Sequence, residues 1–384
     1  MHRKPVVLFV GAHVTPEGGS AHGMFVASRQ LVASPIRDHV EWRLLDATVP
    51  VPLPGWPIRL WLAARRVLVV LAALAFHRID VVLIFAPFNF GRLLDKLAMC
   101  LLGRLFRKRV VLSFRSATRR AERCASLLES IVRATAWSCD AIVCQAEPAV
   151  AMLAEIVGSG DRIIVIPNWI DLAPYEPIAD ARRPTWQSDE PAILFIGRFD
   201  ENKGILELAE AVAALRTAGR RLRLRYAGAG GAGEKLVEHC RQLAITDCVE
   251  ILGAVDGEAK LAAFRSTDIL VLVSATEGLS NAILEAMACG MAIVASPVGA
   301  TPTLIADGEG GFLVPPRDAA ALAEALNKLL DDPARAYSMG QRNRAVVRAR
   351  HDIGHLWPSV LTALTGRHVT TDGREARASG SPQS

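Results

Sequence analysis

The chain has 384 residues, which is too long for one ordinary hydrophobic core and fits two domains of roughly 150–200 residues each. Hydrophobic residues make up 51% of the sequence, so a largely disordered protein is excluded. The seven cysteines include no C-x-x-C pair. This argues against a disulfide framework and a structural zinc site, and it predicts a reducing, cytoplasmic compartment.

Positive charge is concentrated in the first third of the chain. Residues 59–133 include 15 Lys and Arg against 4 Asp and Glu, whereas the whole chain has a net charge of +5. Apolar runs separate these basic residues, but the run 67–76 is far shorter than the roughly 20 residues of a spanning helix. The pattern is typical of a peripheral surface for anionic lipid, with solvated arginines on packed helices as the alternative. Nucleic acid is disfavoured as a partner because no aromatic stacking motif interleaves with the arginines.

Short apolar runs alternate with helix-length segments along the chain, which predicts βαβ units and parallel sheets. We interpret the first run as a strand and not as a signal peptide, because Gly11 and a polar stretch interrupt it. The predicted strands are 6–10, 81–85, 110–114, 141–144 and 163–166, then 192–196, 222–227, 249–252, 269–273 and 292–295. Two doubly wound, Rossmann-like domains in series follow from this order.

The domain boundary is predicted from prolines and polar residues that break the pattern up to Glu190. We expect an N-terminal domain at 1–185, a C-terminal domain at 186–350, a C-terminal helix at 351–366 that returns to the N-terminal domain, and a disordered tail at 367–384.

Two loops with charged residues follow predicted strands of the second half. Gly197–Gly204 places Arg198 and Lys203 five residues apart between glycines, so both cations can face the phosphates of a diphosphate leaving group. The second loop leads from Glu277 into a helix that Ser280 or Asn281 can cap and that contains Glu285. The free N–H groups of such a helix N-terminus suit an anion such as pyrophosphate.

The combination of Gly-Arg…Lys-Gly with a Glu-x7-Glu segment resembles the C-terminal half of the family 4 retaining glycosyltransferases. The resemblance is dense over residues 190–350 and loose before them. It implies the GT-B fold, in which two Rossmann-like domains face a cleft. It also implies transfer of a sugar from a UDP- or GDP-sugar to a glycan or lipid-linked acceptor, with retention and without a metal or other cofactor.

The resemblance also implies roles for individual residues. Arg198 and Lys203 would hold the donor pyrophosphate, Glu277 would bind sugar hydroxyls near the reacting carbon, and Glu285 would take the ribose hydroxyls. The remaining donor contacts would come from Gly19, Val255, Gly278, Leu279, Ser280 and Asn281. This implies that the catalytic residues are Glu277, Arg198 and Lys203.

The sequence departs from the family pattern at three positions. Arg115 lies in a segment where members often have a histidine, Trp169 replaces a glycine, and Thr303 replaces a glutamate. We take Arg115 as an acceptor-side candidate, with a solvated arginine as the alternative.

The sequence also bears on three alternative functions. The G-x-G-x-x-G motif at 228–233 would suit an NAD-dependent oxidoreductase, but it follows the second strand of its domain and no acid ends the next strand. A metal-dependent transferase would use a D-x-D pair, which the sequence lacks, and we expect His351 and His355 to lie at a surface helix end instead of holding zinc. An inert nucleotide-sugar-binding protein is the third alternative.

Overall fold

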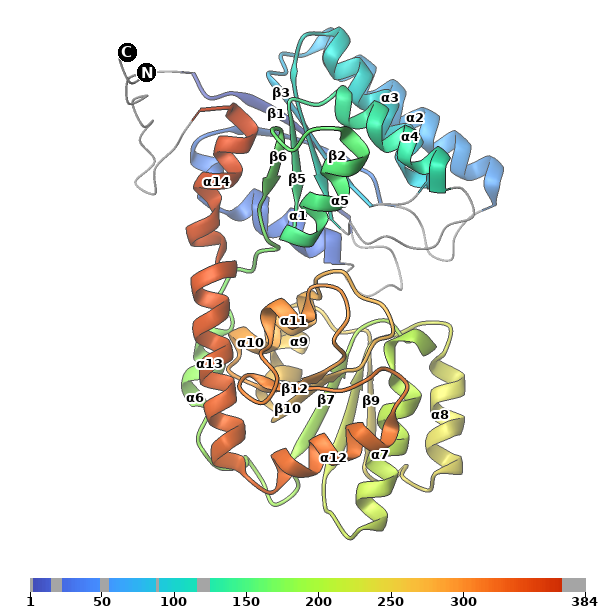
Figure 1. Ribbon diagram of the computed structural model, residues 1–384, viewed down its shortest axis with the longest axis vertical. Coiled ribbons are helices and arrows are strands. Elements are labelled where there is room, and N and C mark those ends of the chain that lie inside the picture. Colours follow the sequence, from blue (N-terminus) through green and yellow to red (C-terminus); the bar gives the residue numbers. More distant parts are fainter. Residues whose placement is uncertain (1–2, 15–22, 49–54, 88–89, 116–124, 368–384) are drawn as a thin grey trace. The chain divides into compact units, whose positions relative to one another are not determined.

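The computed structural model describes residues 3–14, 23–48, 55–87, 90–115 and 125–367 (Figure 1). Within them the chain forms two compact units. The first contains the described residues up to Trp169 and the segment from Ile353 onward, and the second contains Ile170–Asp352. Gly19 and residues 368–384 of the predicted tail lie outside the described residues.

The first unit is built on a parallel sheet with the strand order β2-β1-β3-β4-β5-β6. Strands β1 and β3 are buried along their whole length, as expected for a parallel sheet that helices cover on both faces. The strands are β1 (Val6–Gly11), β2 (Glu41–Asp46), β3 (Val81–Ala86), β4 (Arg109–Phe114), β5 (Ala141–Cys144) and β6 (Ile163–Val165).

Two groups of helices cover the faces of this sheet (Figure 1). Because successive side chains of a strand point to opposite faces, Leu8 packs with one group and Phe9 with the other. The group on the Leu8 face is α2 (Trp56–Phe76), α3 (Phe90–Leu105), α4 (Ala125–Trp137) and α5 (Glu147–Val157). The group on the Phe9 face is α1 (Gly23–Ala33), the 3-10 helix η1 (Pro35–Asp38) and α14 (Ile353–Thr365).

The second unit has a parallel sheet with the order β12-β11-β10-β7-β8-β9, the arrangement of a dinucleotide-binding Rossmann fold. The strands are β7 (Ala192–Ile196), β8 (Arg223–Ala227), β9 (Val249–Gly253), β10 (Ile269–Leu272), β11 (Ala292–Ala295) and β12 (Gly311–Leu313). The helices are α6 (Glu176–Ala181), the 3-10 helix η2 (Glu201–Lys203), α7 (Ile205–Thr217), α8 (Gly233–Gln242), α9 (Gly257–Arg265), α10 (Asn281–Ala288), α11 (Thr301–Leu304), α12 (Ala319–Leu330) and α13 (Pro333–His351).

All ten predicted strands are present, each within one residue of its predicted bounds. Two strands were not predicted. Edge strand β2 reads Glu-Trp-Arg-Leu-Leu-Asp and buries only Leu45, so it has no apolar run, and β12 has three residues. Both strands lie at sheet edges.

The division between the units differs from the predicted boundary after residue 185. The segment that follows Trp169 packs on the second unit, where Tyr175 and Ile178 are part of the core. His351 was expected at a surface helix end and is 4% exposed, because α13 packs on the second unit up to its last residue.

Candidate active site

The carboxyl ends of β7 and β10 lie side by side in the middle of the second sheet. The strand order reverses between these two strands, because β8 and β9 continue on one side and β11 and β12 on the other. In open α/β sheets, ligands bind outside the carboxyl ends of the strands at such a reversal. The two charged loops identified from the sequence begin here.

The loop after β7 is held by its own residues and by β10. The Asp200 carboxylate accepts a 3.0 Å hydrogen bond from the Asn202 amide and so caps η2, the turn that ends at Lys203. Gly204 has φ +73°, and a Cβ atom there would lie 2.5 Å from the Val273 carbonyl oxygen at the end of β10. A glycine is therefore needed to bring Lys203 against β10.

Lys203 and Glu277 meet across the two loops. Lys203 Nζ lies 2.6 Å from Glu277 Oε1, and the buried Ser274 hydroxyl donates to the same oxygen at 2.9 Å. The Ala275 amide donates to the Asn202 carbonyl at 2.7 Å, which joins the backbones of the loops. With side chains 22% and 13% exposed, the lysine and the glutamate are both accessible to a ligand.

Helix α10 begins directly after this loop. Ser280 is its N-cap residue, but the Ser280 hydroxyl makes no capping hydrogen bond. The helix ends in a Schellman motif, in which Gly290 has φ +66° and the Met291 amide donates to the Ala286 carbonyl at 3.0 Å. Because α10 follows β10, its N-terminus lies at the carboxyl edge of the sheet. The first amides of the helix point toward that edge, and the Ser280 hydroxyl does not cap them.

Glu285, predicted to bind the ribose, is a buried residue of α10. Its side chain is 4% exposed, and its Oε1 lies 2.7 Å from Lys260 Nζ on α9. Burial, and then the negative charge of the Glu285 carboxylate, raise the pKa of the Tyr175 hydroxyl. Lys260 is a residue that the sequence reasoning missed, since no motif links position 260 to position 285.

Arg198 is separated from the Lys203–Glu277 pair. Its side chain is 60% exposed and its Nη2 lies 3.0 Å from Asp200 Oδ2. The Asn202 amide, and then Arg198, hold the pKa of the Asp200 carboxyl below its ordinary value, against the effect of burial. Among the described contacts none joins Arg198 to Glu277, and the four charged side chains form three separate pairs, Arg198–Asp200, Lys203–Glu277 and Lys260–Glu285. That the four surround one sugar nucleotide stays a prediction.

Arg198 lines a cavity of about 600 Å³ that Arg317 also lines. Arg317 has φ +62°, a left-handed conformation that is uncommon for a non-glycine residue, and its Nη2 lies 3.4 Å from Asn202 Oδ1. Sequence reasoning missed this arginine, because it follows two prolines after β12 and matches no phosphate-binding motif.

The glycine-rich segment at 228–233 supports the loop after β7. A Cβ atom on Gly228 would lie 1.8 Å from the Gly197 carbonyl oxygen, and the Phe199 amide donates to the Ala229 carbonyl at 2.9 Å. These glycines allow one backbone to pack on another, which explains the motif without a dinucleotide. Two further residues predicted to contact the donor are half-buried. Val255 lies after β9, and Leu279 packs against the core.

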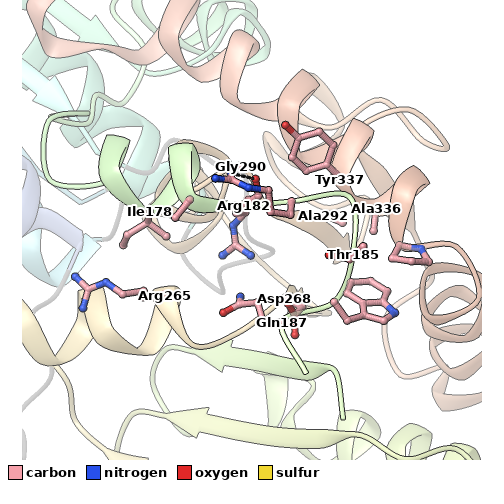
Figure 2. Close-up of a pocket in the computed structure, with 14 residues that line it drawn as sticks. Ile178, Arg182, Thr185, Gln187, Arg265, Asp268, Gly290, Ala292, Ala336 and Tyr337 are labelled. Atoms are coloured by element: carbon pink, nitrogen blue, oxygen red, sulfur yellow. Dashed lines mark hydrogen bonds between the residues drawn. The ribbon is translucent and has the colours of Figure 1, made fainter. Parts of the chain in front are cut away.

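A second cavity, of about 190 Å³, lies at the amino ends of β10 and β11 (Figure 2). Arg182 is half-buried there and donates to the carbonyls of Phe264, Thr267 and Cys289 at 2.7–3.0 Å. Two of these carbonyls lie at the C-terminal ends of α9 and α10, where a cation is favourable. We assign Arg182 to this structural role and not to the donor site.

No group of three or more potential metal ligands occurs among the residues that the model describes. The prediction of a metal-independent site is not tested by this observation and stays a prediction.

Two family models match the chain. "Glycosyltransferase Family 4" matches residues 20–174 and "Glycosyl transferases group 1" matches residues 190–332, one in each half. The chain belongs to this glycosyltransferase family. The predicted family is therefore confirmed, and both charged loops of the second unit lie inside the second match.

Curated relatives of the chain include a glycogen synthase of Mycobacterium tuberculosis, 33% identical over 212 residues, which are 55% of this chain and 49% of the relative. A D-inositol 3-phosphate glycosyltransferase of Nocardia farcinica is 33% identical over 236 residues, 59% of this chain and 51% of the relative. The chain thus spans about half the length of the curated relatives it matches.

Solved structures with the same fold include a sucrose-phosphate synthase of Thermosynechococcus elongatus, with a TM-score of 0.74, 22% identity and coverage of 94% of this chain and 100% of that one. HepE of Anabaena in complex with UDP-glucose has a TM-score of 0.72, 18% identity and coverage of 94% and 99%. The predicted GT-B fold is confirmed.

Proposed function

We propose that the chain is a retaining, metal-independent glycosyltransferase that moves a sugar from a UDP- or GDP-sugar to a lipid-linked or glycan acceptor. The process it would serve is the synthesis of bacterial-type cell-surface polysaccharide or glycolipid. The observation that carries the proposal is the Lys203–Glu277 pair, 2.6 Å long, at the point where the strand order of the second sheet reverses. The related fold of HepE, solved with UDP-glucose, supports a nucleotide-sugar donor.

The mechanism follows from the charges that develop when the nucleotide leaves. Negative charge grows on the diphosphate, where Lys203 and the amides at the start of α10 would stabilise it, and Arg198 would reach it by exchanging Asp200 for phosphate. Positive charge grows on the sugar ring, next to which Glu277 would bind hydroxyl groups. If the departing phosphate oxygen takes the acceptor's proton, attack occurs on the donor's own face and configuration is retained.

The site pair has a further consequence for donor binding. Lys203 has three N–H donors, and its contact with Glu277 uses one of them. A diphosphate can therefore bind Lys203 without breaking its contact with Glu277. The pair would then hold the pyrophosphate and the sugar at a fixed separation, which favours one orientation of the reacting bond.

The test is turnover. The protein is incubated with a panel of UDP- and GDP-sugars, and release of the nucleotide diphosphate is followed with and without candidate acceptors. Slow hydrolysis of one donor supports the proposal even before the acceptor is known. Tight binding of a nucleotide sugar with no detectable turnover of any panel member would instead support the inert binding protein.

We further propose that the first unit contacts an anionic membrane on the cytoplasmic side. None of the helices in the described part of the chain is long and apolar enough to cross a bilayer. Of the 17 exposed large apolar side chains in the described residues, 13 lie on α2, α3 and α4. We call these 13 the α2–α4 surface, and they are Trp56, Ile58, Leu60, Trp61, Leu68, Val69, Leu71, Phe76, Leu94, Leu101, Leu105, Leu127 and Trp137.

The chemistry of the α2–α4 surface suits a lipid headgroup region. Trp56 and Trp61 on α2 are 72% and 62% exposed, and tryptophan favours the boundary between headgroups and acyl chains. Arg59 and Arg65 are exposed on the same helix, and Arg104 lies 4.1 Å from the Trp137 ring. Each such arginine adds about 1 kcal/mol at an anionic surface.

Vesicle sedimentation tests the membrane proposal. We expect binding to vesicles with anionic lipid that weakens with salt and that Trp56→Ser with Trp61→Ser abolishes. Ile251→Ser, which removes a 41% exposed apolar side chain of the second unit, is the matched control and should leave binding unchanged. Binding that is insensitive to salt, or equal in both variants, would contradict the proposed surface.

A further inference from the structure

Arg115 directly follows β4, at the carboxyl edge of the first sheet. Its guanidinium carbon lies 4.7 Å from the centre of the Phe85 ring and 4.5 Å from that of the Trp169 ring. Its Nη2 donates to Asn168 Oδ1, which follows β6. These contacts hold the guanidinium in one place before any ligand binds.

The charge of Arg115 is not balanced within the described residues. No carboxylate is among its contacts, and its Nη1 is buried without a hydrogen-bond partner. Burial lowers the pKa of Arg115 to about 9. A buried donor without a partner costs about 1–3 kcal/mol, and more for a charged group, so the fold holds this arginine in an unfavourable state.

Two buried hydroxyl groups on the same face of the sheet also lack partners. Ser113 lies two residues before Arg115 on β4, so both side chains point to one face. Ser28 lies on α1, which packs on that face, and its Oγ is 3.0 Å from the position of a Cβ atom on Gly11 at the end of β1. Hydroxyl and guanidinium groups are each donors that suit an oxyanion.

We propose that Arg115 is the centre of an oxyanion-binding site of the first unit, which takes the phosphate or carboxylate group of the acceptor. The inference rests on the proposed function, because it gives the acceptor a negative charge. Arg115 as a whole is half-buried at the sheet edge, although its Nη1 atom is buried. A phosphate would supply Nη1 with an acceptor and would neutralise the buried charge.

A purely structural role predicts a different response to substitution. If Arg115 only braces Asn168 and the two aromatic rings, Arg115→Met should destabilise the protein. If the arginine is kept for a ligand, the unbranched apolar side chain removes an unpaired charge and should leave the melting temperature equal or higher. Arg115→Lys keeps the charge but loses the planar fork. Arg104→Met is the control, because Arg104 also lies over a tryptophan ring.

The experiment measures the melting temperature of each variant with saturating UDP or GDP, whichever stabilises the wild type, so that the proposed phosphate-binding loops of the second unit are occupied. Inorganic phosphate and acetate are then added separately against chloride at equal ionic strength. We expect one of the two anions to raise the melting temperature of the wild type and of Arg104→Met. We expect no response from Arg115→Met and at least a tenfold higher midpoint concentration for Arg115→Lys. The anion that acts distinguishes a phosphate from a carboxylate on the acceptor.

An equal anion response in Arg115→Met and wild type would overturn the proposal, as would no response in the wild type. Hydrolysis of the nucleotide sugar needs no acceptor, so its rate reports on the donor site separately from the anion response. A loss of hydrolysis would place Arg115 on the donor side and would also overturn the proposal. If neither UDP nor GDP stabilises the wild type or any variant, the proposed function fails, and that outcome is read independently of the anion response.

Discussion

The Lys203–Glu277 pair can be tested by a double-mutant cycle of Lys203→Met and Glu277→Gln. Lys203→Met removes the cation and leaves the Glu277 carboxylate, 13% exposed, with the Ser274 hydroxyl as its remaining partner. The expected cost is about 2 kcal/mol, between an exposed pair and a fully buried one. For a unit of this size that is about 4–8 °C in melting temperature.

The cycle separates stability from activity. The double variant removes both charges, so it should recover most of the lost stability. It should recover no activity, because each side chain has its own role toward the donor. Each single variant and the double variant should lose about 100–1000-fold in kcat/KM for donor hydrolysis, the usual effect of one lost donor near a developing charge.

The measurements are melting curves and initial rates of nucleotide diphosphate release, and Lys328→Met is a matched control. Lys328 pairs with Glu324 at 2.6 Å on α12 of the same unit, but both side chains are more than half exposed. We expect the control to change stability by less than about 1 kcal/mol. Recovery of activity together with stability in the double variant would contradict a role of Lys203 and Glu277 in donor binding, because the pair would then only stabilise the fold.

Three further outcomes are expected. Gly204→Ala should destabilise the protein by more than about 1 kcal/mol and lower activity, because its Cβ would lie 2.5 Å from Val273; wild-type melting would contradict this. Arg182→Met should cost about 3 kcal/mol or more by removing three bonds to buried carbonyls, with donor affinity unchanged in a titration; equal loss of affinity would place the ligand at that cavity. Turnover should survive EDTA, whereas its complete loss and restoration by Mg²⁺ would contradict a metal-independent site.

The strands could be predicted because parallel sheets buried on both faces leave continuous apolar runs in the sequence. Such a run is missing at β2, an edge strand that mixes charged and apolar residues, and β12 has only three residues. Neither strand could be predicted for this reason. The boundary after residue 185 was wrong because prolines and polar residues mark irregular backbone but do not show which core the segment packs on.

The candidate site could be predicted as far as its loops. Gly204 and the strand before it require Lys203 to lie at the sheet edge, so its meeting with Glu277 follows from topology. The partner of Glu285 could not be predicted, because Lys260 reaches it from another helix and only packing brings the two together. The pairing of Arg198 with Asp200, two residues away, depends on a local turn that no spacing rule describes.

Hydrogen exchange of the backbone amides, measured with and without UDP, locates the donor site. We expect UDP to protect peptides covering 197–204 and 274–285, the two loops joined by the Asn202–Ala275 hydrogen bond and the first turn of α10. Peptides covering 178–187, at the cavity around Arg182, should exchange as before. Protection at 178–187 with none in the two loops would contradict the assignment of the donor site.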